Sequence, residues 1–99
     1  MKVKRREEIE RILREHKEEL REKYGVREIG LFGSYVRGEQ HKRSDVDILV
    51  EFEVVPGLLK FIELENYLSR LLGVRVDLVR RASIREELRE RILSEVVMI

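Results

Sequence analysis

Residues 30–52 have the sequence GLFGSYVRGEQHKRSDVDILVEF and decide the fold, because two predicted strands flank a glycine-containing turn. The first strand is expected over residues 27–32, whose apolar side chains indicate a buried strand. The second is expected over residues 45–52, DVDILVEF, which are rich in β-branched side chains. Between them, Gly33 is followed by a brief helical turn that Gly38 ends, and then by a polar loop. The stretch therefore predicts two strands joined by a compact connection.

Three amphipathic helices and a third strand are predicted around this unit. Apolar side chains recur at three- and four-residue spacing over residues 5–24, 58–72 and 84–96, which is typical of helices that bury one face. Residues 74–79 alternate apolar with charged side chains, as a half-buried strand does. Ser83 and the glutamate three residues after it form a capping box that predicts the start of the last helix. The middle helix is expected to turn inward Leu58, Phe61, Ile62, Leu64, Leu68, Leu71 and Leu72.

The order α-β-β-α-β-α predicts an α/β (α+β) fold, a small mixed sheet of about three strands with helices packed on it. The length of 99 residues fits one domain over residues 1–99. The apolar segment VVMI at residues 96–99 either closes the core or is buried against another subunit. The second is favoured, and a homodimer is left open.

The charge balance excludes some partners. Charged residues make up 41% of the chain, yet Lys+Arg 21 and Asp+Glu 20 nearly cancel, which argues against nucleic-acid binding. No run of about 18 apolar residues occurs, so no membrane span is expected. The absence of cysteine excludes disulfides and thiolate metal sites and favours a cytoplasmic location. Abundant Glu, Lys and Arg, with single Asn and Gln residues and no Thr, indicate a thermophilic source.

Asp45 and Asp47 are the most chemically specific feature of the sequence. They lie two residues apart on a predicted strand, so both carboxylates project from the same face. Two like charges this close repel each other unless a cation lies between them. Divalent cations such as Mg²⁺ prefer oxygen ligands and need few carboxylates when substrate phosphates and water complete the shell. The pair therefore predicts a metal-binding site.

Asp77 is the candidate third carboxylate. It lies on the polar face of the third predicted strand, and a strand-helix-strand connection of this length commonly places its two strands side by side. Asp77 would then face the same cleft as Asp45 and Asp47, where three carboxylates could hold two metal ions. The alternative is an ion pair of Asp77 with Arg75 or Arg80 on an exposed face, and spacing alone gives both interpretations equal weight.

Gly33 and Ser34 predict a phosphate-binding turn at the end of the first strand. Glycine lets the backbone approach a ligand closely, and the Ser34 hydroxyl and free N–H groups can donate to phosphate. Arg37 lies three residues further, on the same side of the turn and within reach of a triphosphate. Ser44, just before the aspartates, is a further candidate for phosphate contact. Taken singly, a Gly-Ser pair is more often an ordinary turn or helix cap.

The stretch over residues 30–52 resembles the signature of the polymerase-β-type nucleotidyltransferase superfamily, in which Gly-Ser is followed after about ten residues by Asp-x-Asp. It is most similar to the smallest branch, the minimal nucleotidyltransferases, typified by antitoxins paired with HEPN-domain ribonuclease toxins. The pattern GS…RG…SDxD matches nearly in full. VRVDLV at residues 74–79 fits the strand that bears the third carboxylate, and the resemblance extends to the terminal helix.

The resemblance implies a role for each residue. Gly33 and Ser34 would bind the nucleotide phosphates, and Asp45 and Asp47 would bind both of two Mg²⁺ ions, with Mn²⁺ as an alternative. Asp77 would bind the catalytic ion and help to activate the acceptor hydroxyl as general base. The substrate implied is ATP, from which AMP is transferred to a tyrosine of a partner HEPN toxin. The chain would then be a protein adenylyltransferase that acts as an antitoxin.

Two other functions stay open. One is a binding module that neutralises its partner by occlusion, without catalysis, and the other is nucleotide transfer to a small molecule such as an antibiotic. All three aspartates are present, which favours the enzyme because a pure binder gains nothing from clustered negative charge. The short length counts against the small-molecule transferase. His41, Lys42, Arg43 and Lys60 could approach a nucleotide, but solvent-exposed positions are expected for them, and His16 is expected at the edge of the core.

Overall fold

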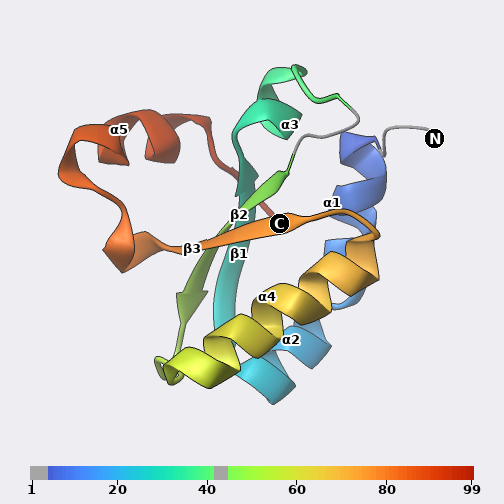
Figure 1. The fold of residues 1–99 in the computed structure, drawn as a ribbon, viewed down its shortest axis with the longest axis vertical. Helices are drawn as coiled ribbons and strands as arrows, with labels where there is room; N and C mark the ends of the chain where they lie inside the picture. The colour runs from blue at the N-terminus through green and yellow to red at the C-terminus, as the bar shows by residue number, and fades with distance from the viewer. Residues whose placement is uncertain (1–4, 42–44) are drawn as a thin grey trace.

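The computed structural model describes residues 5–41 and 45–99, and in these ranges it contains a four-stranded mixed sheet (Figure 1). The strands lie in the order β3-β2-β1-β4, with β1 antiparallel to both of its neighbours and β2 parallel to β3. In chain order they are β1 (Val26–Phe32), β2 (Val46–Phe52), β3 (Val76–Arg80) and β4 (Val97–Met98). The predicted mixed sheet is confirmed, with one strand more than expected.

The helices surround this sheet in the predicted order. They are α1 (Arg6–Glu15), α2 (Lys17–Tyr24), α3 (Ser34–Arg37), α4 (Leu58–Leu72) and α5 (Glu86–Glu95), with a 3₁₀ turn, η1 (Arg81–Ser83), before α5. Helix α4 has the predicted bounds and crosses over between β2 and β3, which lie side by side as expected. None of the helices in the described ranges has the length and hydropathy that a membrane span requires.

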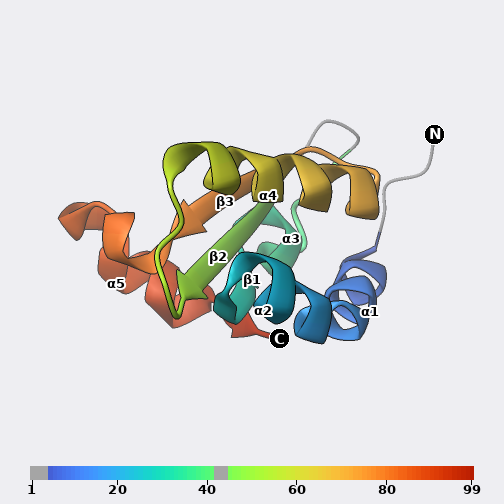
Figure 2. The same ribbon diagram turned by 90° about the horizontal axis from the view of Figure 1, so that it is seen from below.

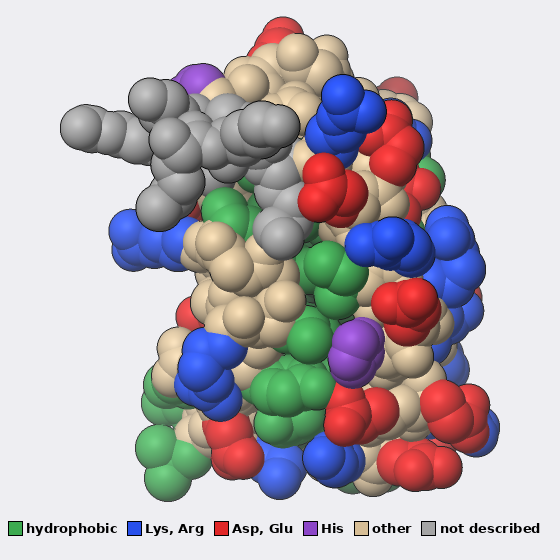
Figure 3. All heavy atoms as spheres, turned by 90° about the vertical axis from the view of Figure 1, so that its right-hand side faces the viewer, with side chains coloured by type: hydrophobic (Ala, Val, Ile, Leu, Met, Phe, Trp, Pro, Cys, Tyr) green, Lys and Arg blue, Asp and Glu red, His purple; other side chains and the backbone are tan. Residues whose placement is uncertain are grey.

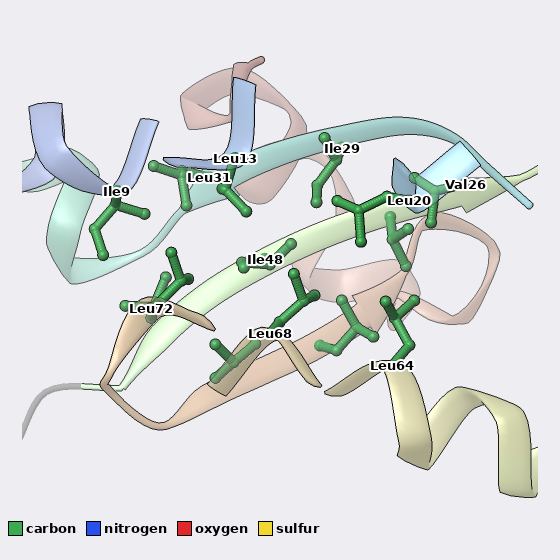
Figure 4. Close-up of a cluster of buried hydrophobic side chains, with 14 of the residues drawn as sticks. Ile9, Leu13, Leu20, Val26, Ile29, Leu31, Ile48, Leu64, Leu68 and Leu72 are labelled. Carbon is green, nitrogen blue, oxygen red and sulfur yellow. The ribbon is translucent and has the colours of Figure 1, made fainter. Parts of the chain in front are cut away.

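Helices α1, α2 and α4 pack against one face of the sheet and form the main hydrophobic core with it (Figure 2). Leu64, Leu68 and Leu72 recur every four residues along α4 and are buried, and Figure 4 shows them facing the strands. The other helical residues that are buried in this core are Ile9, Leu13 and Leu20. Each such side chain contributes about 1.5–3 kcal/mol when removed from water, so this face supplies most of the stability.

The opposite face of the sheet is covered more thinly, by η1 and α5. Its buried residues are Phe32, Leu49 and Ile84, whereas α5 itself has no fully buried side chain. Side chains alternate along β2, so Asp47 lies on the same face as Leu49. A ligand can therefore reach the sheet from this thinly covered face.

The surface carries charges of both signs. On the side of the molecule that includes α1 and the C-terminal end of α4, acidic and basic side chains surround a narrow strip of hydrophobic ones (Figure 3). Elsewhere in the structure, charges are paired along α1 and α2, as Arg6 with Glu10 at 2.5 Å and Lys23 with Glu19 at 3.2 Å. The side shown in Figure 3 therefore presents no extended field of one sign, in keeping with the near-zero net charge.

The prediction of a single helix over residues 5–24 is wrong in one respect: the structure has two helices there, α1 and α2, separated at His16. The backbone of His16, with φ −106° and ψ 6°, leaves helical geometry, and its ring Nδ1 donates to the Ile12 carbonyl oxygen at 2.8 Å. The expected position of His16 at the core edge is confirmed, since it is part-buried. The apolar spacing continues across the break, so the hydrophobic pattern does not indicate it.

Two of the residues predicted to face inward from α4 are exposed instead: Leu58 at 74% and Ile62 at 42%. Ile62 precedes buried Leu64 by two residues, which places it roughly 200° around the helix. The predicted buried face was therefore wider than the face that α4 buries in the structure. The structure buries the stripe that includes Leu68 and leaves the first turn of α4 in solvent.

The capping box predicted for Ser83 and Glu86 is absent from the structure. Ser83 belongs to η1, and the N-cap of α5 is Arg85, which makes no side-chain hydrogen bond to the helix. Ile84 and Arg85 are extended between the two elements. This conformation lets Ile84 insert under the sheet and delays the start of α5 to Glu86.

The C-terminal segment closes the sheet of its own chain as β4, which pairs with Gly30 and Leu31 of β1. Gly30 makes this approach possible, because a Cβ there would lie 2.8 Å from Met98 Sδ and 2.9 Å from Val96 Cγ2. The sequence favoured burial against another subunit instead. A strand this short has no alternation to detect, so it was not predicted.

We expect Leu68→Ala to lower the free energy of unfolding by about 2–5 kcal/mol, because Leu68 is fully buried. The matched control is Leu59→Ala in the same helix, where the side chain is 83% exposed and the change should stay within about 0.5 kcal/mol. Urea denaturation of both variants measures the difference. Equal losses would mean that α4 packs through another face.

Candidate active site

The three candidate carboxylates come together where β2 begins. Parallel pairing of β2 with β3 places Asp47 beside Asp77, and adjacent strands lie roughly 5 Å apart. Asp45 lies two residues before Asp47 and therefore on the same face. Asp47 is part-buried and Asp77 is exposed. In the part of the chain that the structure describes, no ion pair joins Asp77 to Arg75 or Arg80, so the geometry favours the shared cleft over the alternative.

Helix α4 fixes the strand that carries Asp77. Strand β3 lies at the edge of the sheet, and the two N–H groups that flank Asp77 on its free side are bound by side chains of α4. The N–H of Val76 donates to Ser69 Oγ at 3.0 Å. The N–H of Leu78 donates to Glu65 Oε2 at 2.9 Å. The sequence analysis missed both side chains, although each directly follows a buried leucine on α4.

The carboxyl group of Asp47 is electrostatically strained. Its pKa is raised from 3.8 to about 6, first by burial and then by the negative charges of Asp77 and Asp45. The guanidinium of Arg37 opposes this increase of the pKa, and the Glu95 carboxylate adds to it. The same repulsion that raises the pKa would be relieved by a bound cation.

The backbone of Gly33 lies close to the Asp47 carboxylate. It ends β1 with φ +80°, and an added Cβ would lie 2.0 Å from Asp47 Oδ2. The pairing of Phe32 with Asp47 sets this close approach. Only glycine fits here, because any other residue would combine a left-handed backbone with a direct clash.

Ser34 and Arg37 lie on the short helix α3 that follows. The Gly33 carbonyl accepts the N–H groups of Val36 at 3.0 Å and Arg37 at 3.1 Å, which begins the turn predicted from the sequence. Ser34 is part-buried, and its hydroxyl has no hydrogen bond to another described residue. That hydroxyl is therefore available to a ligand beside Gly33.

Glu95, at the end of α5, is the site residue that the sequence analysis missed. Its Oε1 accepts the Gly33 N–H at 2.8 Å, and both of its oxygens accept Arg37 Nη1, at 3.1 and 3.2 Å. Arg37 also donates from Nε to Glu39 at 2.8 Å. A signal was present, because Glu95 follows Ile92 by three residues and shares the inward face of the helix.

Gly33, Arg37, Asp47 and Glu95 line a cavity of about 190 Å³ between the end of β1 and α5, whereas Ser34, Asp45 and Asp77 are not among its lining residues. Its lining residues are Phe32, Gly33, Arg37, Asp47, Leu88, Arg91, Ile92 and Glu95. Hollows of about 250 and 400 Å³ lie around Glu51, further along β2. Glu51 is neutralised there by Arg27 at 2.7 Å and Arg81 at 3.7 Å, so converging carboxylates distinguish the smaller cavity as the site.

Several residues considered from the sequence are not brought to this cavity. Lys60 lies over the ring of Tyr24, 5.2 Å from its centroid. His41 is exposed at the end of the described segment. Ser44, a candidate for phosphate contact for which a turn or capping role was favoured, lies outside the described residues, as do the basic residues Lys42 and Arg43.

The donor set at this edge suits a hard divalent cation. Carboxylate oxygens are ligands that Mg²⁺ prefers, and the three aspartates are close enough for their charges to interact. Across residues 5–41 and 45–99, no three histidine or carboxylate side chains are gathered closely enough to hold an ion by themselves. The residues therefore fit a metal whose shell is completed by water and substrate phosphates, not a preformed protein cage.

Known proteins are similar to this chain in sequence and in fold. The chain matches the nucleotidyltransferase domain family over residues 13–99. It is 63% identical to the protein adenylyltransferase MntA of Thermococcus cleftensis over 93 residues, which cover 94% of both chains. A solved structure described as a candidate minimal nucleotidyltransferase has a TM-score of 0.72 at 38% identity, over 93% of this chain and 89% of that chain. A toxin–antitoxin crystal structure with AMP-PNP has a TM-score of 0.69 at 29% identity, over 93% of this chain and 69% of that chain.

The fold and these relatives define an enzyme of the nucleotidyltransferase class, with the polymerase-β-like architecture that the sequence predicted. The chain belongs to the nucleotidyltransferase domain family. Within it, the chain is a minimal nucleotidyltransferase, as the motif in residues 30–52 indicated.

We expect Gly33→Ala to destabilise the fold by roughly 3 kcal/mol or more. The new Cβ would clash with the Asp47 carboxylate, and the positive φ of residue 33 would strain the backbone of any residue other than glycine. Gly38→Ala is the matched control. It has a similar φ of +73° but nothing within 4 Å of an added Cβ, so it should cost only about 1–2 kcal/mol. Chemical denaturation compares the two, and equal losses would show that the contact with Asp47 is unimportant.

The raised pKa of Asp47 predicts a pH-dependent stability. Between pH 3.8 and about 6 the folded state binds this proton more tightly than the unfolded chain, so stability falls as the pH rises, and the full cost remains above that range. Asp47→Asn should therefore raise the free energy of unfolding at neutral pH by about 1–2 kcal/mol, allowing for solvent screening. The gain should vanish below pH 3.8. A loss of stability at neutral pH would contradict the assignment.

Proposed function

We propose that this chain is a metal-dependent protein adenylyltransferase that transfers AMP from ATP to a tyrosine hydroxyl of a HEPN-type toxin and thereby acts as its antitoxin. The observation that carries the proposal is the grouping of Asp45 and Asp77 around Asp47, whose carboxylate lines the cavity beside Gly33. The name of the Thermococcus relative and the AMP-PNP in the toxin–antitoxin structure support the reaction and the nucleotide.

Each residue has a proposed part in this reaction. Gly33 and Ser34 bind the triphosphate through the Gly33 N–H, whose acceptor in this structure is Glu95, and through the Ser34 hydroxyl, which is bonded to no other described residue. Asp45 and Asp47 would hold two Mg²⁺ ions, or Mn²⁺ in their place, with Asp77 as a further ligand to one of them. When bound, these ions supply Lewis-acid stabilisation of the charge that develops on the phosphate oxygens.

The transfer forms a bond between the acceptor oxygen and the α-phosphorus of ATP and breaks the bond from that phosphorus to the bridging oxygen, so that pyrophosphate leaves. The carboxylate of Asp77 takes the proton of the acceptor hydroxyl as general base. Asp77 is exposed, so the tyrosine of another chain can reach it. Arg37 offers a positive charge to the phosphates.

The rest of the proposal concerns the setting of the enzyme. It acts as a single domain over residues 1–99, in the cytoplasm, where a protein without cysteine needs no protection from reduction. Its composition fits a thermophilic source, in which networks of ion pairs gain value. Nucleic acid is not a proposed partner, because positive and negative charges nearly balance.

The test is transfer of label from α-labelled ATP to a purified HEPN-type toxin, in the presence and absence of Mg²⁺. We expect label on the toxin with Mg²⁺ only, and none from γ-labelled ATP. Asp45→Asn/Asp47→Asn should reduce the rate by on the order of a hundredfold or more, because charge stabilisation is lost. A double variant that still neutralises the toxin without labelling it would instead support neutralisation by occlusion.

A further inference from the structure

We propose that Glu95 is an internal competitor of the triphosphate, which holds the phosphate-binding groups until nucleotide displaces it. The hydrogen bonds from Gly33 and Arg37 to the Glu95 carboxylate are termed the Glu95 latch. The inference rests on the proposed nucleotide site and adds to it a residue that sets nucleotide affinity and couples binding to α5.

The donors in the latch are the ones that a phosphate would need. The Gly33 N–H and the Arg37 guanidinium converge on one carboxylate, with distances of 2.8 Å for the former and 3.1 and 3.2 Å for the latter. A carboxylate resembles a phosphate in charge and in its acceptor oxygens. The Glu95 side chain is only 19% exposed, and its bond to the Gly33 N–H is part-buried, whereas its bonds to Arg37 are exposed.

Two electrostatic effects explain why Glu95 contacts Gly33 and Arg37 in the free protein and why a bound nucleotide would displace it. Gly33 is buried, and an unpaired buried N–H is costly, so the Glu95 carboxylate stabilises the protein by accepting that N–H. Its charge also adds to the repulsion around Asp47. A bound triphosphate would satisfy the same donors and repel the carboxylate, so both cannot occupy the site.

The element that carries Glu95 is suited to move. Helix α5 has no fully buried side chain, whereas the core on the other face of the sheet is filled by α1, α2 and α4. The cavity that α5 borders measures about 190 Å³, below the roughly 300–1,000 Å³ usual for small-molecule sites. Displacement of Glu95 would open it, while β4 stays paired with β1 and anchors the chain beyond.

The first test is calorimetric titration of Mg²⁺-ATP into the wild type and Glu95→Gln. The variant keeps the size of the side chain but loses its charge, so we expect it to bind about fivefold more tightly, because a larger fraction of molecules is competent. Glu90→Gln is the matched control, since it removes the same charge from an exposed position on α5 and should leave the affinity unchanged. Equal or weaker binding by Glu95→Gln would overturn the proposal and indicate that Glu95 positions Arg37 for the nucleotide.

The second test separates the latch from the nucleotide site. Amide hydrogen exchange of the ligand-free proteins should be faster over α5 in Glu95→Gln than in the wild type and Glu90→Gln. Adding Mg²⁺-ATP to the wild type should produce the same increase. If no protein binds ATP, the proposed nucleotide site fails, whereas unchanged exchange over α5 in ligand-free Glu95→Gln overturns the latch.

Discussion

Repulsion among carboxylates where β2 lies beside β3 is the physical constraint that shapes the candidate site, and the rest of the fold holds these charges together. The parallel register of β2 and β3 places Asp47 beside Asp77, and the bonds from α4 to the outer edge of β3 hold that register. The strands cannot separate to relieve the charge without losing the core beneath them. The repulsion instead raises the pKa of Asp47, and the proposed cation, bound with nucleotide phosphates, would relieve it.

One face of the sheet carries most of the hydrophobic core, and the other carries the candidate site. Three helices bury a continuous leucine-rich core on one face, which is rigid enough to hold like charges together. The other face has a thin cover, and the backbone of Gly33 reaches the Asp47 carboxylate there without an intervening side chain. Glu95 completes this face as an acceptor that belongs to the chain itself. In this proposal, a phosphate must therefore compete with the Glu95 carboxylate for the donors at this face of the sheet.

The sequence predicted what local pattern and covalent spacing determine. The strands, the bounds of α4 and the shared face of Asp45 and Asp47 follow from alternation, helical spacing and a glycine stop. The break at His16 and the two-residue strand β4 were missed, because neither interrupts a hydrophobic pattern. Asp77 could be placed only as one of two alternatives until the register was known. Glu95 accepts a hydrogen bond from Gly33, which is 62 residues earlier in the sequence. Periodicity within one helix could not identify so remote a partner.

The measurement that tests the central claim most directly is paramagnetic broadening of amide signals by Mn²⁺-ATP in the free protein. Mn²⁺ replaces Mg²⁺ on carboxylate and phosphate oxygens and broadens only nearby signals. If the carboxylate edge binds the metal-nucleotide, broadening should centre on Gly33, Asp47 and Asp77 and disappear in Asp45→Asn/Asp47→Asn. Broadening centred on the hollows around Glu51, or unaffected by the double substitution, would contradict the assignment.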